Sequence, residues 1–278
     1  MKHTKPKKRL DLILQEKMPE FSRSRIKAEI MAGRVLVGGK VCDKPGSMIE
    51  NDAKITMREA DNPYVSRGGL KLEGALKDLS LNVKDLIVLD IGASTGGFTD
   101  CLLRNGAKTV YALDVGYGLL DLSLRNDPRV IVLERFNVRY LEAGDIPEAP
   151  DLAVVDVSFI SLFKVLPVLF KLSIPSILVL IKPQFEVGRI EASRGKGVIR
   201  NPEMHKKVIF DIIDFACKEG YCSRGVVFSR LPGPKGNIEY FLLLNHRPAE
   251  SSICLGDYKK TVEKQITQAH RLFTEKNK

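Results

Sequence analysis

The chain has 278 residues, a hydrophobic fraction of 44% and a formal net charge of +10 at pH 7. This hydrophobic fraction is sufficient for a packed core, and the length allows one large domain or two smaller ones. The five cysteines are scattered without a C-x-x-C pair and the four histidines lie far apart. This spacing excludes the usual zinc-binding patterns and favours a reducing compartment, and the basic charge favours an anionic partner such as nucleic acid.

No segment has the pattern of a secretion signal or a membrane span. The apolar residues after the basic N-terminus are interrupted by Asp11 and Glu16. The most apolar stretch, residues 152–181, contains Asp156 and Lys164 among other charges, so no window of ~18 residues in it is free of charge. We therefore expect a cytoplasmic protein without stable membrane association, and we favour a monomer.

Residues 1–60 carry more than half of the net charge, with 14 Lys or Arg against 8 Asp or Glu, a difference of +6. The pattern predicts a short helix near residues 10–14, a helix over 24–32, a hairpin over 35–42 and a strand at 55–57. Basic side chains on the second helix cannot all face a core, so they are candidates for RNA contacts, although a solvated surface would carry the same charges. The candidates here are Arg9, Arg23, Arg25, Lys27 and Arg34.

Residues 7–58 resemble the small alpha-L RNA-binding domain shared by a small-subunit ribosomal protein, pseudouridine synthases and tyrosyl-tRNA synthetases. The resemblance rests on Arg9-Leu10-Asp11, on Ser22-Arg23-Ser24-Arg25 and on the run from Ala28 through Gly33 to Gly39. It implies a small α+β RNA-binding domain at residues 1–60. A polar segment with a proline follows, and we expect a linker at 61–66 and a second domain at 67–278.

The second domain is predicted to begin with a helix over 68–79 and then to alternate strands with helices. This alternation predicts an α/β fold with a doubly wound, mostly parallel sheet whose last two strands form an antiparallel edge pair. The expected strands are 86–91, 109–114, 130–134, 152–157, 176–182, 223–229 and 238–244, and the expected helices between them are 97–105, 118–125, 160–171 and 202–219. Residues 256–276 are expected to form a final basic helix or a tail.

The most informative segment, residues 89–99, places a glycine-rich turn between a strand and a helix. Glycines allow close approach of a ligand, and the helix N-terminus offers free N–H groups. The spacing is neither G-x-G-x-x-G nor a P-loop, and it is typical of sites for S-adenosylmethionine (SAM). The predicted cofactor-binding residues are Asp90, Gly92, Ser94, Thr95, Gly96, Gly97 and Phe98.

Asp114 ends the next strand, about twenty residues past the glycines. A carboxylate at this position can accept both hydroxyl hydrogens of a ribose, so Asp114 is a further predicted SAM ligand. A role as a helix cap or turn residue would also explain it.

Charged residues follow two fully apolar strands, at the positions where parallel sheets gather ligands and catalytic groups. Asp156 follows one strand and Lys182 the next, while Glu239 is placed on an edge strand and Lys71 on the first helix. Unpaired burial would cost on the order of several kcal/mol, so we expect these four side chains to pair with one another and to act in catalysis. A capping or solvated charge at each position is the simpler alternative.

In order and location these four residues resemble the Lys-Asp-Lys-Glu tetrad of FtsJ-type ribose 2'-O-methyltransferases. Over residues 7–245 the chain resembles the TlyA family, whose members are named both hemolysins and rRNA 2'-O-methyltransferases. The runs 64–72, 90–98, 156–161 and 180–186 are close to its signatures. The resemblance implies a class I SAM-dependent methyltransferase fold, ribosomal RNA or a ribosomal subunit as partner, and no metal.

One departure concerns the adenine side of the cofactor. Asn137 stands where FtsJ enzymes have an aspartate. An amide can still form hydrogen bonds with an adenine edge, so the resemblance implies Asn137, together with Asp156, as further SAM contacts.

The implied reaction begins from a ribose 2'-hydroxyl, which is a poor nucleophile at neutral pH. Lys182 could lose its proton and act as a base, or stabilise the developing alkoxide as a cation, and the sequence leaves both roles open. Asp156 would hold the lysine and orient the hydroxyl. The sulfonium of SAM already activates its methyl group, so alignment can supply much of the catalysis.

Basic residues also border the predicted site. The polar loop 189–202 and the start of the first helix supply further candidates for contacts with RNA phosphates, although a solvated loop would have the same composition. These candidates are Arg67, Arg189, Arg194, Lys196 and Arg200.

Three functions are compatible with these patterns. A ribosomal RNA 2'-O-methyltransferase explains the glycine turn and the four charged residues together. A membrane-active hemolysin would need a signal peptide, a span or a lytic helix, none of which the sequence indicates. An RNA-binding ribosome-assembly factor with a vestigial methyltransferase domain would not need the intact set of four.

Overall fold

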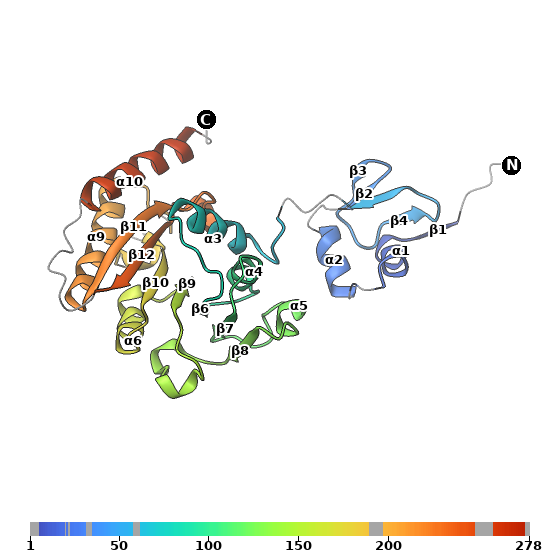
Figure 1. Cartoon of the computed structure of the whole chain (residues 1–278). Coiled ribbons are helices and arrows are strands. Elements are labelled where there is room, and N and C mark those ends of the chain that lie inside the picture. Colours follow the sequence, from blue (N-terminus) through green and yellow to red (C-terminus); the bar gives the residue numbers. More distant parts are fainter. Residues whose placement is uncertain are drawn as a thin grey trace. The chain divides into compact units, whose positions relative to one another are not determined.

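The computed structural model describes residues 6–19, 21, 23–31, 35–57, 62–188, 197–247 and 258–275. The chain divides into two compact units, Met1–Pro63 and Tyr64–Lys278 (Figure 1). Each unit has a hydrophobic core of its own, so each buries its apolar side chains without the other.

The first unit is a small α+β fold. Helices α1 (Leu10–Lys17) and α2 (Arg23–Met31) pack on short antiparallel strands, with Leu10, Ile26 and Val35 buried between them. Strands β3, β2 and β5 form one sheet, and β1 pairs with β4. The strands are Lys7–Arg9 (β1), Val35–Val37 (β2), Lys40–Val41 (β3), Met48–Glu50 (β4) and Ile55–Met57 (β5).

Most predicted elements of this unit are present, and two strands were missed. The predicted helix over 24–32 is α2, the predicted hairpin is formed by β2 and β3, and the predicted strand at 55–57 is β5. The sequence did not indicate β1 and β4, because neither has the apolar, β-branched composition that marks β2 and β5.

The second unit is built on one sheet of seven strands in the order β11-β12-β10-β9-β6-β7-β8. Neighbours from β10 to β8 are parallel, and β12 is antiparallel to both β10 and β11. The predicted mostly parallel sheet with an antiparallel edge pair is therefore confirmed. Its strands are Ile87–Ile91 (β6), Thr109–Asp114 (β7), Val130–Glu134 (β8), Leu152–Val155 (β9), Ser176–Ile181 (β10), Tyr221–Phe228 (β11) and Tyr240–His246 (β12).

Helices cover both faces of this sheet (Figure 1). Because successive strand residues point to opposite faces, Val88 packs with one set of helices and Leu89 with the other. The first set is α3 (Arg67–Asp78), α4 (Gly97–Arg104) and α5 (Leu122–Arg125). The second is α6 (Leu166–Lys171), α9 (Pro202–Lys218) and α10 (Tyr258–Glu275), and the short helix α7 (Pro183–Glu186) follows β10.

Three local predictions for the second unit are wrong. Glu239 does not lie on an edge strand: it precedes β12 by one residue, and β12 lies between β10 and β11. The helix predicted over 118–125 is only α5, because Gly118 has a left-handed backbone with φ +68°. The helix predicted over 160–171 is a 3-10 turn followed by α6, since Pro167 in the first turn of α6 lacks an amide hydrogen.

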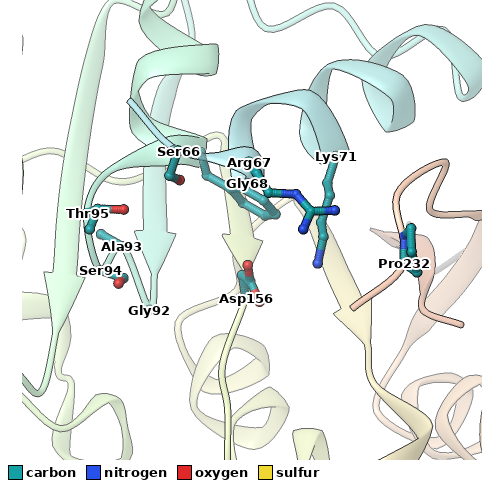
Figure 2. Close-up of a pocket in the computed structure, with 12 residues that line it drawn as sticks. Ser66, Arg67, Gly68, Lys71, Gly92, Ala93, Ser94, Thr95, Asp156 and Pro232 are labelled. Atoms are coloured by element: carbon teal, nitrogen blue, oxygen red, sulfur yellow. The ribbon is translucent and has the colours of Figure 1, made fainter. Parts of the chain in front are cut away.

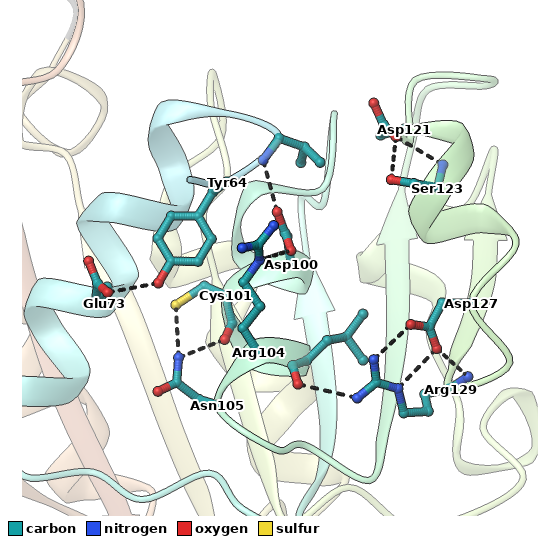
Figure 3. Close-up of polar contacts among 12 residues, drawn as sticks. Tyr64, Glu73, Asp100, Cys101, Arg104, Asn105, Asp121, Ser123, Asp127 and Arg129 are labelled. Atoms are coloured by element: carbon teal, nitrogen blue, oxygen red, sulfur yellow. Dashed lines mark hydrogen bonds and ion pairs between the residues drawn. The ribbon is translucent and has the colours of Figure 1, made fainter. Parts of the chain in front are cut away.

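The second unit begins at Tyr64, earlier than the predicted start at residue 67. The Tyr64 hydroxyl donates to Glu73 at 2.9 Å, and the backbone N–H of Val65 donates to Asp100 at 2.9 Å (Figure 3). Arg104 pairs with the same Asp100 carboxylate at 2.7 Å and lies 5.4 Å from the Tyr64 ring. These contacts fix the segment before α3 against α4, so the start of α3 has a defined position beside the turn that follows β6.

Candidate active site

The glycine loop, residues 92–97, connects β6 to α4 and requires glycine at two positions. Gly92 (φ +84°) and Gly96 (φ +94°) have left-handed backbones. A Cβ atom on Gly92 would lie 2.5 Å from the carbonyl oxygen of Asp156, and one on Gly96 would lie 2.3 Å from Leu124 Cδ1. Gly92 therefore allows the end of β9 to approach the loop, whereas Gly96 serves the packing of α5.

A cavity of about 470 Å³ opens beside the glycine loop (Figure 2). In Figure 2 the side chains of Arg67 and Lys71 extend from α3 between Asp156 and Pro232. The cavity is thus lined by the glycine loop and by two of the four predicted catalytic residues, Lys71 and Asp156, whereas Lys182 and Glu239 do not line it. The predicted residues that line it are Arg67, Lys71, Gly92, Ser94, Thr95, Gly97, Phe98 and Asp156.

Four further cavity-lining residues were not predicted: Ser66, Gly68, Ala93 and Pro232. A signal existed for two of them, because the run Ser66 to Gly69 starts a helix with adjacent glycines, which are poor helix formers. A Cβ atom on Gly97 would lie 2.2 Å from Ser66 Oγ, so the starts of α3 and α4 are in close contact. Pro232 comes from the loop between β11 and β12, whose position depends on the sheet order.

Asp90, within β6, is completely buried behind the glycine loop. Thr99 Oγ1 donates to Asp90 Oδ2 at 2.6 Å, and the buried Oδ1 has no hydrogen-bond partner among the described residues. Burial raises the pKa of Asp90 to about 7, with smaller contributions from the carboxylates of Asp156 and Asp114. A buried acceptor without a partner indicates a place for a donor or a cation.

Asp114, at the end of β7, holds the glycine loop in place. Its Oδ2 accepts from the Ser94 N–H at 2.8 Å and its Oδ1 from the Gly116 N–H at 2.7 Å. Each oxygen keeps a second lone pair, so the carboxylate can still accept from a ligand hydroxyl. Asn137, in contrast, caps a 3-10 turn by accepting from the Arg139 N–H at 3.1 Å, and it does not line the cavity.

Four charged side chains form two ion pairs, each with one member at the cavity and one buried behind it, and together they are the ion-pair cluster: Lys71, Asp156, Lys182 and Glu239. In the first pair, Lys182 Nζ lies 2.5 Å from Asp156 Oδ1 and donates to Ser158 Oγ at 2.9 Å. Asp156 and Lys182 follow the neighbouring parallel strands β9 and β10, whose carboxyl ends meet at one edge of the sheet.

The second pair joins helix α3 to the residue before β12. Lys71 Nζ lies 2.6 Å from Glu239 Oε2, and Glu239 is completely buried. Gln184 Nε2 lies 3.5 Å from the other Glu239 oxygen, and a Cβ atom on Gly233 would lie 2.1 Å from it. Because an unpaired carboxylate would be costly in this position, Lys71 and Glu239 hold each other in a fixed geometry.

An exposed aromatic residue that the sequence analysis did not single out stands next to the ion-pair cluster. Phe159 is 91% exposed and has φ +64°, which is unusual for a bulky side chain. Its ring centroid lies 5.1 Å from that of Phe185, and the Phe185 ring centroid lies 5.9 Å from Lys182 Nζ. The sequence signal that could have identified Phe159 was its position three residues after Asp156, a predicted catalytic residue. A strained backbone that presents an aromatic ring to solvent points to a binding role.

The predicted RNA-binding residues divide into three groups. Arg23, Lys27, Arg67 and Arg200 are exposed. Arg9 forms two hydrogen bonds with Asp11, at 2.7 and 3.0 Å, and this contact lowers the pKa of Asp11. The remaining predicted residues lie outside the part of the chain that the structure describes. They are Arg34, Arg189, Arg194 and Lys196, together with the side chain of Arg25.

Cysteines and metal-ligating residues do not form a centre in the described ranges. Cys42, Cys101 and Cys217 are free thiols, and Cys222 is disulfide-bonded, which the cysteine spacing did not predict. In the same ranges no three His, Cys, Asp or Glu side chains are grouped so that they could hold a metal ion. None of the described helices combines the length and apolarity needed to cross a membrane.

Comparison with known proteins identifies the family. The FtsJ-like methyltransferase family matches residues 64–246, and the S4 domain family matches residues 8–55. The chain is 44% identical over 239 residues to the 16S/23S rRNA (cytidine-2'-O)-methyltransferase TlyA of Mycobacterium tuberculosis (strain ATCC 25618 / H37Rv), with 85% of this chain and 89% of that protein covered. The chain belongs to the TlyA family of FtsJ-like methyltransferases.

Two more comparisons extend over nearly the whole chain. YqxC of Bacillus subtilis (strain 168) is 45% identical over 276 residues, which is 98% of each protein. A solved structure of a hemolysin-type protein from Streptococcus thermophilus has a TM-score of 0.75 and 40% identity over 99% of each chain. The predicted resemblances, an RNA-binding domain of the alpha-L (S4) type and a TlyA-type methyltransferase domain, are confirmed.

Proposed function

We propose that this TlyA-family methyltransferase transfers the methyl group of SAM to a ribose 2'-hydroxyl of ribosomal RNA. The observation that carries the proposal is the ion-pair cluster: Lys71 and Asp156 line the cavity beside the glycine loop, and each is paired with a charge behind it, Glu239 and Lys182 respectively. The rRNA (cytidine-2'-O)-methyltransferase name of the M. tuberculosis relative supports both the substrate and the position of transfer.

The residues around the glycine loop fit SAM, whose sulfonium and ammonium groups are cationic. Asp90 offers a buried oxygen without a described partner, and the carboxylates of Asp114 and Asp156 lie close enough to raise its pKa. The glycine-loop residues Gly92, Ser94 and Gly97 line the cavity beside these carboxylates. We propose that these residues and the rest of the glycine loop hold the cofactor. When bound, SAM supplies a methyl group that its sulfonium already activates.

The ion-pair cluster can prepare a ribose hydroxyl for methyl transfer. The Lys182 ammonium, placed between Asp156 and Ser158, can stabilise the negative charge that develops on the hydroxyl oxygen. Asp156 also lines the cavity, so it can accept a hydrogen bond from the hydroxyl and orient it. Lys71, fixed by the buried Glu239, adds a second cation to the cavity wall. We propose alignment and electrostatic stabilisation, with Lys182 as the catalytic cation. As the O–CH3 bond forms and the S–CH3 bond breaks, the hydroxyl proton passes to Asp156 and S-adenosylhomocysteine leaves.

The proposed RNA partner fits the exposed surface of both units. Arg23 and Lys27 project from α2 of the S4 domain, and Arg67 is exposed at the cavity. Such cations bind phosphates without regard to sequence. Phe159, beside the ion-pair cluster, offers a ring on which an unpaired base can stack. We propose that residues 1–60 supply RNA affinity and residues 67–278 the chemistry, and that the chain works in the cytoplasm, where ribosomes are.

Methyl transfer from isotopically labelled SAM to ribosomal subunits tests this proposal. After digestion of the RNA to nucleosides, mass spectrometry separates 2'-O-methylated from base-methylated products. We expect the label on 2'-O-methylated nucleosides and a strongly reduced signal with Lys182→Ala. Label on bases alone, from a folded protein that binds SAM, would reject ribose methylation and leave base methylation as the activity.

A further inference from the structure

A buried histidine on the opposite face of the sheet contacts the residue after Glu239 directly and the residues before it through Ile199. His205, on α9, is completely buried. Its Nε2 lies 2.9 Å from the carbonyl oxygen of Ile199, and its Nδ1 lies 2.9 Å from the hydroxyl oxygen of Tyr240. Tyr240 is the residue after Glu239 and begins β12.

The partners of His205 define which nitrogen carries the hydrogen. A carbonyl oxygen can only accept, so Nε2 donates to Ile199. Nδ1 is therefore the acceptor, and the Tyr240 hydroxyl donates to it. His270 of α10 lies with its Nε2 3.2 Å from the same Nδ1. Burial lowers the pKa of His205 to about 4, which keeps the ring neutral and this arrangement intact near neutral pH.

The contact with Ile199 continues to the other side of Glu239. The Ile199 N–H donates to Asn237 Oδ1 at 3.1 Å, and Asn237 Nδ2 donates to the carbonyl oxygen of Gly197 at 2.8 Å. The backbone carbonyl of Asn237 accepts from the Gly233 N–H at 2.8 Å. Gly233 is the glycine whose backbone lies against the Glu239 carboxylate. One route from His205 therefore reaches the residues before Glu239, and the other reaches the residue after it.

The two faces of the sheet explain this arrangement. Tyr240 packs in the core beneath α9 and α10, whereas Glu239 meets Lys71 on α3 at the opposite face. Successive residues of an extended chain point to opposite sides. The backbone around Glu239 is thus held from one face while its carboxylate acts on the other.

We propose that His205 is a positioning residue for methyl transfer, which fixes the backbone on both sides of Glu239 and thereby the place of the Lys71 ammonium at the cavity. The inference rests on the proposed role of the ion-pair cluster. His205 touches neither the cavity nor the reacting groups. A displacement of a positioned group by a fraction of an ångström is sufficient to slow an aligned reaction.

Variants of His205 can separate the two routes. His205→Gln can keep a donor near the Nε2 position, and His205→Asn can keep an acceptor near the Nδ1 position. We expect His205→Ala to lower the single-turnover rate about tenfold, with Gln and Asn each restoring part of the rate. The affinity for SAM should stay within about twofold, because the glycine loop is not touched.

Tyr240→Phe removes only the hydroxyl of the second route. If the routes are as proposed, the contact that Tyr240→Phe removes is one of those that His205→Gln removes, so the double variant should be no slower than His205→Gln alone. Independent, additive losses would contradict the route through Tyr240.

Tyr221→Phe is the matched control, because Tyr221 is also completely buried in the sheet and its hydroxyl donates to the Ile174 carbonyl at 2.9 Å. Tyr221→Phe should lower the melting temperature about as much as Tyr240→Phe does. It should not change the single-turnover rate on ribosomal subunits from cells that lack this protein. If Tyr221→Phe lost as much rate as Tyr240→Phe, His205 would contribute only to the general stability of the fold and not to the positioning of Glu239.

Lys71→Ala, assayed in parallel, separates failure of the inference from failure of the proposed function. If Lys71→Ala is slow and all folded His205 variants react at the wild-type rate, the positioning role is wrong and the proposed function stands. If Lys71→Ala is as fast as the wild type, the role of the Lys71–Glu239 pair is wrong and the inference falls with it, whereas the proposed function is tested separately by Lys182→Ala.

Discussion

The glycine loop and the ion-pair cluster both contribute residues to the cavity, the cluster through Lys71 and Asp156, but they are assembled in different ways. The glycine loop, with Asp90 and Asp114, comes from one continuous stretch of chain and is fixed by backbone geometry and short contacts. The ion-pair cluster brings together α3, the ends of β9 and β10, and the residue before β12. We propose that the cofactor-binding part is assembled mainly from this continuous stretch, with Asp156 as the contribution from elsewhere, whereas the catalytic part depends on the sheet order.

Asp156 is the residue that belongs to both parts, since it pairs with Lys182, lines the cavity and has its carbonyl against Gly92. Asp156→Asn should therefore lower the single-turnover rate by at least ~a hundredfold and also weaken SAM binding. Calorimetry and single-turnover kinetics on the same preparation measure both effects. Asp151→Asn, at the other end of β9, is the control and should leave both unchanged; a normal rate in Asp156→Asn would separate the residue from the chemistry.

The pH dependence of stability tests whether the Asp90 carboxyl group is buried as the structure shows. Because its pKa is raised from 3.8 to about 7, the folded state binds the proton more tightly than the unfolded state. The stability that protonated Asp90 contributes is complete below pH ~4 and is lost as the pH rises towards ~7. The side chain of Asp90→Asn stays neutral at every pH. The free energy of unfolding of Asp90→Asn minus that of the wild type should therefore rise by about 2 kcal/mol from pH 5 to pH 7.

Urea unfolding of wild type and Asp90→Asn at a series of pH values, without SAM, measures this difference. The Asn side-chain oxygen can still accept from Thr99, so the local structure should persist. A difference that does not change between pH 5 and 7 would show that the carboxyl group is not held in an environment that disfavours its charge.

Gly92 tests whether the glycine loop acts on the cofactor alone. A methyl group on Gly92 meets the Asp156 carbonyl, and the residue would keep a left-handed backbone. We expect Gly92→Ala to weaken SAM binding by at least ~tenfold, about 1.4 kcal/mol. Gly220→Ala is a matched control, because Gly220 has φ +80° with no atom within 4 Å of its Cβ position. Equal SAM affinities of the two variants would mean that the close approach of β9 does not matter.

The S4 domain should affect neither part of the site, and the smallest effect is expected there. Arg23→Ala combined with Lys27→Ala removes two exposed cations of α2. RNA affinity should fall several-fold and the salt dependence should become shallower by ~1 per lost phosphate contact, while SAM affinity is unchanged. Lys218→Ala, an exposed lysine at the end of α9, serves as the control. An unaltered salt slope in the double variant would exclude these two side chains as phosphate contacts.

The same difference in assembly explains which parts of the site the sequence could predict. The glycine loop is a contiguous pattern, and Asp156 and Lys182 each follow an apolar strand, so their common edge follows from a parallel sheet. The pairing of Lys71 with Glu239 was not specified, because it depends on β12 entering the sheet between β10 and β11.

Single residues with an unusual backbone or a distant contact were also beyond the sequence. No glycine or proline in the sequence next to Phe159 indicates the left-handed backbone that exposes its ring. Pro232 lines the cavity only because the loop before β12 folds back to α3. Gly96 was predicted as a cofactor contact, but glycine is required there because Leu124 packs against it. Local patterns therefore found the site, and long-range packing decided its final members.

Lys182→Ala tests most directly the claim that the ion-pair cluster supplies chemistry and the glycine loop supplies cofactor affinity. Two quantities are measured on one folded preparation: the dissociation constant for SAM, and the single-turnover rate of 2'-O-methylation with saturating SAM and ribosomal subunits. Lys164→Ala, an exposed lysine of the 3-10 turn after β9, is the control. We predict a rate at least ~a hundredfold below wild type with a SAM dissociation constant within about twofold. A wild-type rate, or a loss of SAM binding that accounts for the slower rate, would contradict the division of roles.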